Sequence, residues 1–165
     1  MINDADLAAV SAQLGRPPRG ARRVAFRCQC GWPAVVETQP RLDDQTPFPT
    51  FWYLTCRRLN TALSTLESDG VMREMQDRLT ADAELAELYR AAHMSYLAVR
   101  ESVAAVEEIS GVSAGGMPSR VKCLHALAAH SLAAGPGVNP FGDEALRIVS
   151  ERGVWPHSGT CVSEA

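Results

Sequence analysis

The chain has 165 residues, of which 46% are hydrophobic and 21% are charged, and its formal net charge is −3. This composition is typical of one globular domain, and it excludes a disordered chain, a collagen-like repeat and a small scaffold that depends on disulfides. The near-neutral charge balance also argues against a general nucleic-acid-binding protein.

The first third of the chain has the pattern of one helix followed by three strands. Leu7, Val10 and Leu14 recur at helical spacing before Gly15, which predicts a helix over residues 4–14. Alternating apolar and charged residues predict a β-hairpin with strands over 22–29 and 33–38. Aromatic and β-branched residues then predict a third strand over 50–56, after a proline-rich loop.

The remainder has helical periodicity. Its longest helix is expected from Leu85 to Val106, where seven apolar residues form a stripe. The other predicted helices span residues 59–70, 72–79, 119–134 and 143–151. The predicted fold class is α+β, a small N-terminal β-hairpin or three-stranded sheet packed against a mainly helical C-terminal part. We expect a single domain over residues 1–153 and a flexible C-terminal tail over 154–165.

The compartment can be read from the N-terminus and the cysteines. The opening residues are acidic rather than basic and apolar, and no stretch approaches the ~20 apolar residues that span a bilayer. We therefore expect a cytoplasmic protein without a membrane span. In a reducing compartment cysteines serve as metal ligands, as reactive thiols or as small buried residues rather than as a disulfide framework.

Four cysteines and one histidine form a candidate metal site. Cys28 and Cys30 are two residues apart in a predicted strand, so their side chains point the same way. Cys56 closes the third predicted strand, directly before a helix start. Cys123 and His125 lie in the first turns of the helix predicted to begin at Ser119. Such soft ligands suit zinc or an iron–sulfur cluster.

The spacing of the last two residues limits how they bind. Residues two apart on a helix diverge by about 200°, so Cys123 and His125 reach one metal ion only if the first turn is irregular. Two alternatives remain open. The cysteines are buried and inert, or Cys56 is the reactive thiol of a redox protein, activated by the helix N-terminus that follows it. Cys161 is expected to be incidental.

A glycine-rich segment before the same helix is a candidate anion site. Glycines allow close backbone approach, and a helix N-terminus offers free amides and a positive dipole end. The candidate residues are Gly115, Gly116, Ser119, Arg120 and Lys122. No P-loop pattern is present, so a plain capped helix is the alternative. The expected ligand is a small anion.

Other function classes find less support in the sequence. Neither a G-x-S-x-G nor an H-E-x-x-H motif is present, which ranks hydrolases of those types low. Basic residues near the N-terminus, Arg16, Arg19, Arg22 and Arg23, lack interleaved aromatic residues and are interpreted as a solvated face rather than as an RNA-binding surface. The helix from Leu85 to Val106 would serve a non-enzymatic interaction protein as a docking face, if its apolar stripe were exposed.

Several separated segments also resemble one protein family. They are CQCG at 28–31, PFPTFWYLTC at 47–56, GVMREM at 70–75, SAGGMPSRVKCLH at 113–125 and GPGVNPFGDEAL at 135–146. Together they resemble a family of small actinobacterial proteins, the domain of unknown function 501 family, from about Asp6 to Glu151. The family often has proline where this chain has Gln29 and Arg57, and these departures spare every cysteine. The resemblance implies genomic neighbours that include a septum-forming membrane protein and an exopolyphosphatase. The alternative function is therefore an interaction or regulatory protein associated with cell division.

Overall fold

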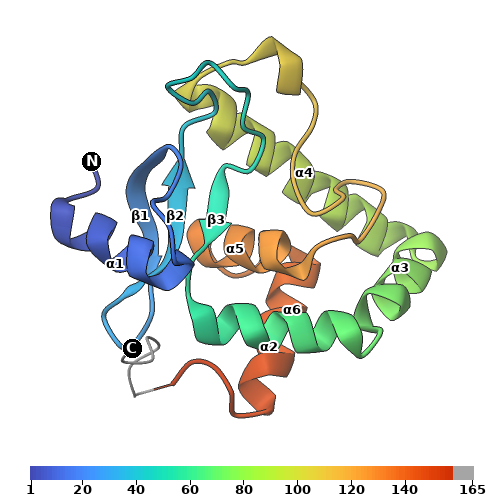
Figure 1. Ribbon diagram of the computed structural model, residues 1–165. Coiled ribbons are helices and arrows are strands. Elements are labelled where there is room, and N and C mark those ends of the chain that lie inside the picture. Colours follow the sequence, from blue (N-terminus) through green and yellow to red (C-terminus); the bar gives the residue numbers. More distant parts are fainter. Residues whose placement is uncertain (158–165) are drawn as a thin grey trace.

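A computed structural model describes residues 1–157 and has the predicted α+β architecture (Figure 1). Three antiparallel strands, β1 (Ala21–Arg27), β2 (Pro33–Thr38) and β3 (Trp52–Leu54), form one sheet in the order β1-β2-β3. The predicted hairpin and third strand are therefore confirmed, although β3 is shorter than expected. In the register, Val36 lies opposite both Val24 and Tyr53.

Helix α1 (Asp4–Leu14) is attached to the sheet by polar contacts. The Arg27 guanidinium of β1 forms an ion pair with Asp6 at 2.7 Å. The Gln13 side chain donates a hydrogen bond of 2.7 Å to the carbonyl of Pro33, which begins β2. These contacts fix α1 against the two strands of the hairpin.

Helix α5 (Leu124–Ala134) lies at the centre of the molecule in Figure 1. It contacts all three strands as well as two other helices, α2 (Arg57–Ser68) and α6 (Pro140–Glu151). Its sequence is almost entirely apolar, which is the pattern of a helix enclosed on all sides. Helices α3 (Val71–Ala81) and α4 (Ala83–Val103) complete the helical part, with a short 3-10 helix over Glu107–Ile109.

The contact between α5 and α6 requires a glycine. A Cβ atom at Gly142 would lie 2.2 Å from the carbonyl oxygen of Leu127 and 2.3 Å from the Ser131 hydroxyl. Helix α6 also begins one turn earlier than predicted. The Asn139 side chain accepts a hydrogen bond of 3.0 Å from the Gly142 amide, and Pro140 occupies the first turn.

Most of the apolar stripe of the longest helix faces the core. Ala92 and Tyr96 of α4 are completely buried, whereas Leu88 is 53% exposed. The helix ends at Val103 rather than at Val106, because the backbone is already extended at Ala104. Within residues 1–157, no helix is long and apolar enough to cross a membrane.

The helix predicted to begin at Ser119 begins at Leu124 instead, so that boundary is wrong. Between these two positions, side chains of neighbouring helices form hydrogen bonds with the backbone of residues 119–121. Gln76 of α3 donates to the Ser119 carbonyl and accepts from the Val121 amide, and the Tyr89 hydroxyl of α4 donates to the Arg120 carbonyl. These contacts compete with helical hydrogen bonds, so the segment stays irregular up to Cys123.

The start of the C-terminal segment packs against the rest of the domain. Trp155, which lies in the region expected to be a flexible tail, is 6% exposed, and its ring centroid is 6.3 Å from that of Phe26 in β1. Residues 158–165, including Cys161, lie outside the described residues.

One buried histidine makes the core sensitive to acid. His130 of α5 is completely buried and stacks on Trp52 with ring centroids 5.0 Å apart. Its Nδ1 atom accepts a hydrogen bond of 3.2 Å from the Asn139 side chain, and its Nε2 atom has no hydrogen-bond partner within residues 1–157. Burial lowers the pKa of His130 to about 4, so the folded protein holds the neutral ring.

This lowered pKa predicts a loss of stability in acid. The unfolded chain binds a proton at His130 near pH 6.5 and the folded chain only near 4, so the free energy of unfolding falls as the pH drops through that range. The full effect is about 3 kcal/mol. In a His130→Phe variant, urea unfolding followed from neutral pH to about 4 should show a smaller pH dependence than in the wild type. Because all other groups titrate in both proteins, equal pH dependence would contradict the prediction.

Candidate metal centre

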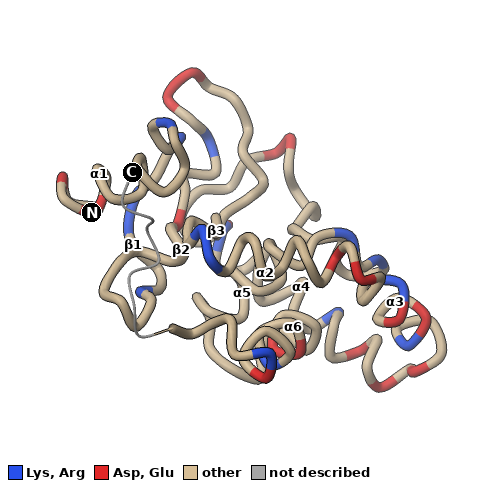
Figure 2. Tube along the Cα trace, turned by 60° about the horizontal axis from the view of Figure 1, so that its bottom comes forward, with Lys and Arg blue, Asp and Glu red and all other residues tan. Residues whose placement is uncertain are grey.

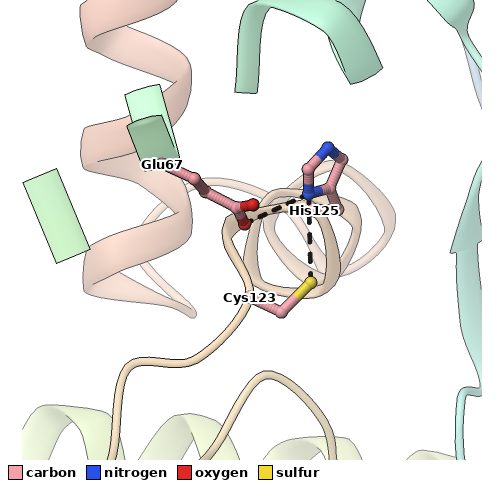
Figure 3. Close-up of side chains that lie close together, drawn as sticks. All are labelled: Glu67, Cys123 and His125. Carbon is pink, nitrogen blue, oxygen red and sulfur yellow. Dashed lines mark hydrogen bonds and ion pairs between the residues drawn. The ribbon is translucent and has the colours of Figure 1, made fainter. Parts of the chain in front are cut away.

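Three side chains with metal-binding chemistry converge at the N-terminus of α5 (Figure 3). They are Glu67 from α2, Cys123 just before α5 and His125 in its first turn. Their ligand atoms all lie within 4.8 Å of one another. The side chains of His125 and Glu67 are 23% and 24% exposed, so solutes can reach them from one side.

Helix α2 places Glu67 there through its periodicity. Asn60, Ser64 and Glu67 are spaced by four and three residues and therefore share one face of the helix. The buried Leu59, Leu63 and Leu66 lie on the adjacent side of the helix. The leucines pack into the core, so the neighbouring polar face lies at the edge of the core, along the start of α5.

Glu67 also satisfies the start of α5. Its Oε1 atom accepts a hydrogen bond of 2.8 Å from the Leu124 amide, one of the amides that have no partner within the helix. A carboxylate at this position interacts favourably with the helix dipole. The chain therefore supplies its own anion at the N-terminus of α5.

Cys123 and His125 meet because Cys123 is not helical. It is the N-cap residue, with φ −151° and ψ 104°, so its side chain does not follow the helical rotation. Its Sγ atom lies 3.9 Å from Nδ1 of His125. The condition that the first turn be irregular is therefore met, and the two predicted residues are brought together.

The hydrogen bonds of His125 assign a proton to both ring nitrogens. Nε2 lies 3.0 Å from the Asn60 carbonyl oxygen, which can only accept. Nδ1 lies 3.2 Å from Oε1 of Glu67, which already accepts from the Leu124 amide. Both nitrogens therefore donate, and the ring is an imidazolium cation.

The pKa values of the pair agree with this assignment. The hydrogen bond to Cys123 raises the pKa of His125 to about 9, against the effect of burial, and the charge of Glu67 raises it further. Burial has the largest single effect on the Cys123 thiol and opposes its ionisation, but the hydrogen bonds to His125 and to the Ala126 backbone and the charge of His125 together lower the pKa of Cys123. The contact between Cys123 and His125 therefore raises the pKa of the histidine and lowers that of the cysteine.

An open cleft of ≈ 270 Å³ lies in front of this pair. Its walls come from β3 and from the cluster, and include Trp52, Tyr53, Asn60, Cys123 and His125. We refer to it as the cluster cleft. A small molecule bound there would contact the sulfur and the imidazole directly.

The other predicted ligands lie elsewhere. Cys28 and Cys56 are buried, at 4% and 0% exposure, and Cys30 is partly exposed next to the core. In the part of the chain that the structure describes, no group of three or more possible ligands includes Cys28, Cys30 or Cys56. Of the predicted set, the cluster contains Cys123 and His125, and it adds Glu67, which was not predicted.

The glycine-rich segment predicted to bind an anion does not lead directly into a helix, because α5 begins at Leu124 rather than at Ser119. Ser119 is not a cap, and the amides of Arg120 and Lys122 donate to the carbonyls of Gly116 and Gly115 at 2.9 and 2.8 Å. These amides are occupied within the loop, so they are not directed at a ligand. A positive φ at Gly115 and at Gly116 allows the turn that makes these hydrogen bonds.

Glu67 is the member of the site that sequence reasoning missed. The signal was a polar face at 60, 64 and 67 on an otherwise leucine-rich amphipathic helix. Such a face is usually solvated. Only the packing of α2 beside α5 turns it into part of a site.

The fold and the cluster define an α+β protein with a Glu/Cys/His group, of which Cys123 and His125 line an open cleft. A model of the family described as protein of unknown function (DUF501) matches residues 24–147, which is most of the chain. The chain belongs to this family, as its resemblance implied. Neither the curated proteins nor the solved structures gave a match.

The effect of Cys123 on the pKa of His125 can be tested by NMR in metal-free protein. The ring protons of His125 should titrate near pH 9, and a Cys123→Ser variant should bring the pKa of His125 down toward the ordinary value of 6.5, because the strongest contribution comes from the sulfur. A Ser64→Ala variant is the control, since Ser64 contacts only the other ring nitrogen, at 3.2 Å. A pKa of His125 that is the same in the wild type and the Cys123→Ser variant would contradict the assignment.

Proposed function

We propose that Glu67, Cys123 and His125 bind one zinc ion, and that its remaining coordination position opens into the cluster cleft. The observation that carries this proposal is the convergence of an oxygen, a sulfur and a nitrogen ligand on one point. Zinc binds all three ligand types and is four-coordinate in most protein sites. The protein would thus be a zinc protein with a site of the catalytic type.

The distances within the cluster support the proposal. Tetrahedral zinc with ordinary bond lengths places neighbouring ligand atoms about 3.3–3.6 Å apart. Nδ1 of His125 lies 3.2 Å from Oε1 of Glu67 and 3.9 Å from Sγ of Cys123. Small side-chain rotations are sufficient to reach zinc geometry.

The second ring nitrogen of His125 is held in the manner usual for a metal ligand. Histidine ligands commonly donate their other N–H to a carbonyl or carboxylate, which fixes the ring orientation. Nε2 of His125 faces the Asn60 carbonyl at 3.0 Å. Loss of the Nδ1 proton would leave a lone pair directed between the sulfur and the carboxylate.

The donor set favours zinc over the alternative cofactor. Iron–sulfur clusters are usually held by four cysteine thiolates, whereas this cluster offers one. A zinc site with three protein ligands and an open position acts as a Lewis acid that polarises a carbonyl or phosphoryl oxygen. We place this function in the cytoplasm, where reducing conditions keep Cys123 available as a thiolate.

Isothermal titration calorimetry of metal-free protein with zinc tests the proposal. We expect one ion per chain. A Cys123→Ser or His125→Ala variant should weaken binding by more than about a hundredfold, beyond the 10- to 100-fold effect of outer residues. Glu67→Gln should also weaken binding, and circular dichroism would verify that each variant is folded.

The control variants are Ser64→Ala and Cys30→Ser. Ser64 is a neighbour of the cluster, and Cys30 is a partly exposed cysteine of the predicted set. Both should keep the affinity of the wild type. If folded wild-type protein fails to bind zinc, or if loss of Cys30 abolishes binding as strongly as loss of Cys123, this site is wrong.

A specific observation favours a second candidate, a reactive thiol. Cys123 lies beside His125 at a helix N-terminus, and its pKa is lowered, which is the environment in which cysteines become nucleophilic. This candidate is centred on Cys123, which lines the cluster cleft, rather than on Cys56, which is completely buried. The reactive-thiol function requires metal-free protein, because zinc bound to the Cys123 sulfur would block its reaction.

Alkylation kinetics separate the two candidates. In metal-free protein iodoacetamide should modify Cys123 faster than any other cysteine, as followed by peptide mass spectrometry. Zinc should suppress this reaction if the first proposal holds. Fast alkylation that zinc does not slow would favour the reactive thiol, and slow alkylation of Cys123 in metal-free protein would contradict that candidate.

A further inference from the structure

A second cleft shares its wall with the cluster cleft. It has a volume of ≈ 260 Å³, and its lining includes Arg16, Arg19, Val36 and Phe48. Thr50 and Tyr53 line both clefts. The two clefts therefore lie next to each other along β3, and we call the pair the β3 groove. Their combined size is in the range of small-molecule sites.

The chemistry changes along the β3 groove. The second cleft combines the guanidinium groups of Arg16 and Arg19 with the apolar surfaces of Phe48 and Tyr53. The cluster cleft, which shares Tyr53, has Cys123 and His125. Such a groove suits an elongated molecule with an anionic end, an apolar middle and a reactive end.

Arg16 is the better placed of the two arginines to hold the anion. Arg19 already forms an ion pair with Asp44 at 3.0 Å. Arg16 makes only long contacts, to the Pro17 carbonyl at 3.3 Å and to the Tyr53 hydroxyl at 3.5 Å, and no ion pair of Arg16 is found within the described chain. Its planar guanidinium therefore retains donors for a carboxylate or a phosphate.

The charge distribution agrees with this polarity. Residues up to Arg58 include eight arginines and five acidic residues, whereas the rest of the chain has eight basic and 14 acidic residues. Figure 2 shows basic residues along β1, whereas acidic residues, with basic residues between them, lie around α3, away from the sheet. An anion is thus attracted to the sheet side of the molecule, where the β3 groove lies.

We propose, resting on the zinc centre proposed above, that the β3 groove binds a small elongated molecule with a terminal carboxylate or phosphate. Arg16 binds the anionic end, and the opposite end reaches the open position of the zinc ion. Phe48 and Tyr53 contact the apolar chain between the two ends. The substrate class is therefore an anionic acyl or phosphoryl compound, since its reacting group must present an oxygen to zinc.

The test uses straight-chain dicarboxylic acids in which one end is converted to a hydroxamate, a strong zinc ligand. For each chain length the free end is a carboxylate, a phosphonate or a neutral amide. Calorimetry on zinc-loaded protein should show that one of the two anionic ends binds about tenfold more tightly than the amide at the best-fitting length. The anion that binds more tightly identifies carboxylate or phosphate as the natural group.

Two variants that remove the same charge test whether the preference for the anionic end comes from Arg16. In Arg16→Gln the preference for the anionic end should disappear while the affinity of the amide compound stays unchanged. In Arg41→Gln, which removes an equal charge outside both clefts, the preference should persist. Equal binding of charged and neutral ends to the wild-type protein would overturn the assignment of Arg16 and leave the zinc site standing. Failure of the wild-type protein to bind zinc alone would overturn both proposals.

Discussion

The enclosure of helix α5 is the constraint on which the rest of the structure depends. Its residues are apolar on nearly every side, and it is surrounded by the sheet, α2 and α6. The close approach of α6 at Gly142 leaves no room for α5 to shift. The direction of α5 and the position of its N-terminus are therefore determined by core packing. Cys123 and His125 inherit that position, so the cluster is built on a rigid element rather than on a loop.

Polar side chains of α2, α3 and α4 position the segment at the start of α5 in addition to the core packing. Glu67 joins α2 to the first amide of α5. Gln76 and Tyr89 hold the backbone over 119–121, which leads directly into Cys123. The extended conformation of Cys123 follows from these contacts, and that conformation allows its sulfur to face His125. Glu67 is thus placed by α2 and His125 by α5, while contacts from α3 and α4 shape the segment that leads to Cys123, so the meeting point of the three residues is a property of the tertiary fold.

The parts of the fold that were predictable from sequence are those with a local cause. The three strands and most helices follow from alternation or from helical periodicity, which hold whatever the chain packs against. The start of α5 was predicted wrongly, because Gln76 and Tyr89 act on the segment from more than 30 residues away. No local pattern contains that information.

The candidate site likewise has residues that the local sequence identifies and one residue that only the tertiary fold adds. Cys123 and His125 were identified because they are close in sequence and have metal-binding chemistry. Glu67 was missed because its face of α2 looks like an ordinary solvated face until α5 is placed beside it. Cys28, Cys30 and Cys56 were grouped with Cys123 from residue type and from their places in the predicted strands. Neither property fixes the distance between side chains of separate elements.

The charge balance of the cluster links the proposed zinc centre to the polarity of the β3 groove. Without metal, the contact with Cys123 and the charge of Glu67 raise the pKa of His125 to about 9, so the ring keeps its Nδ1 proton. A zinc ion would replace that proton, because it needs the same position. With two anionic ligands and one neutral imidazole, the zinc-bound cluster would be close to neutral. The guanidinium of Arg16 would then be the stronger long-range attraction for the terminal anion of a ligand, which would leave the opposite end for the metal.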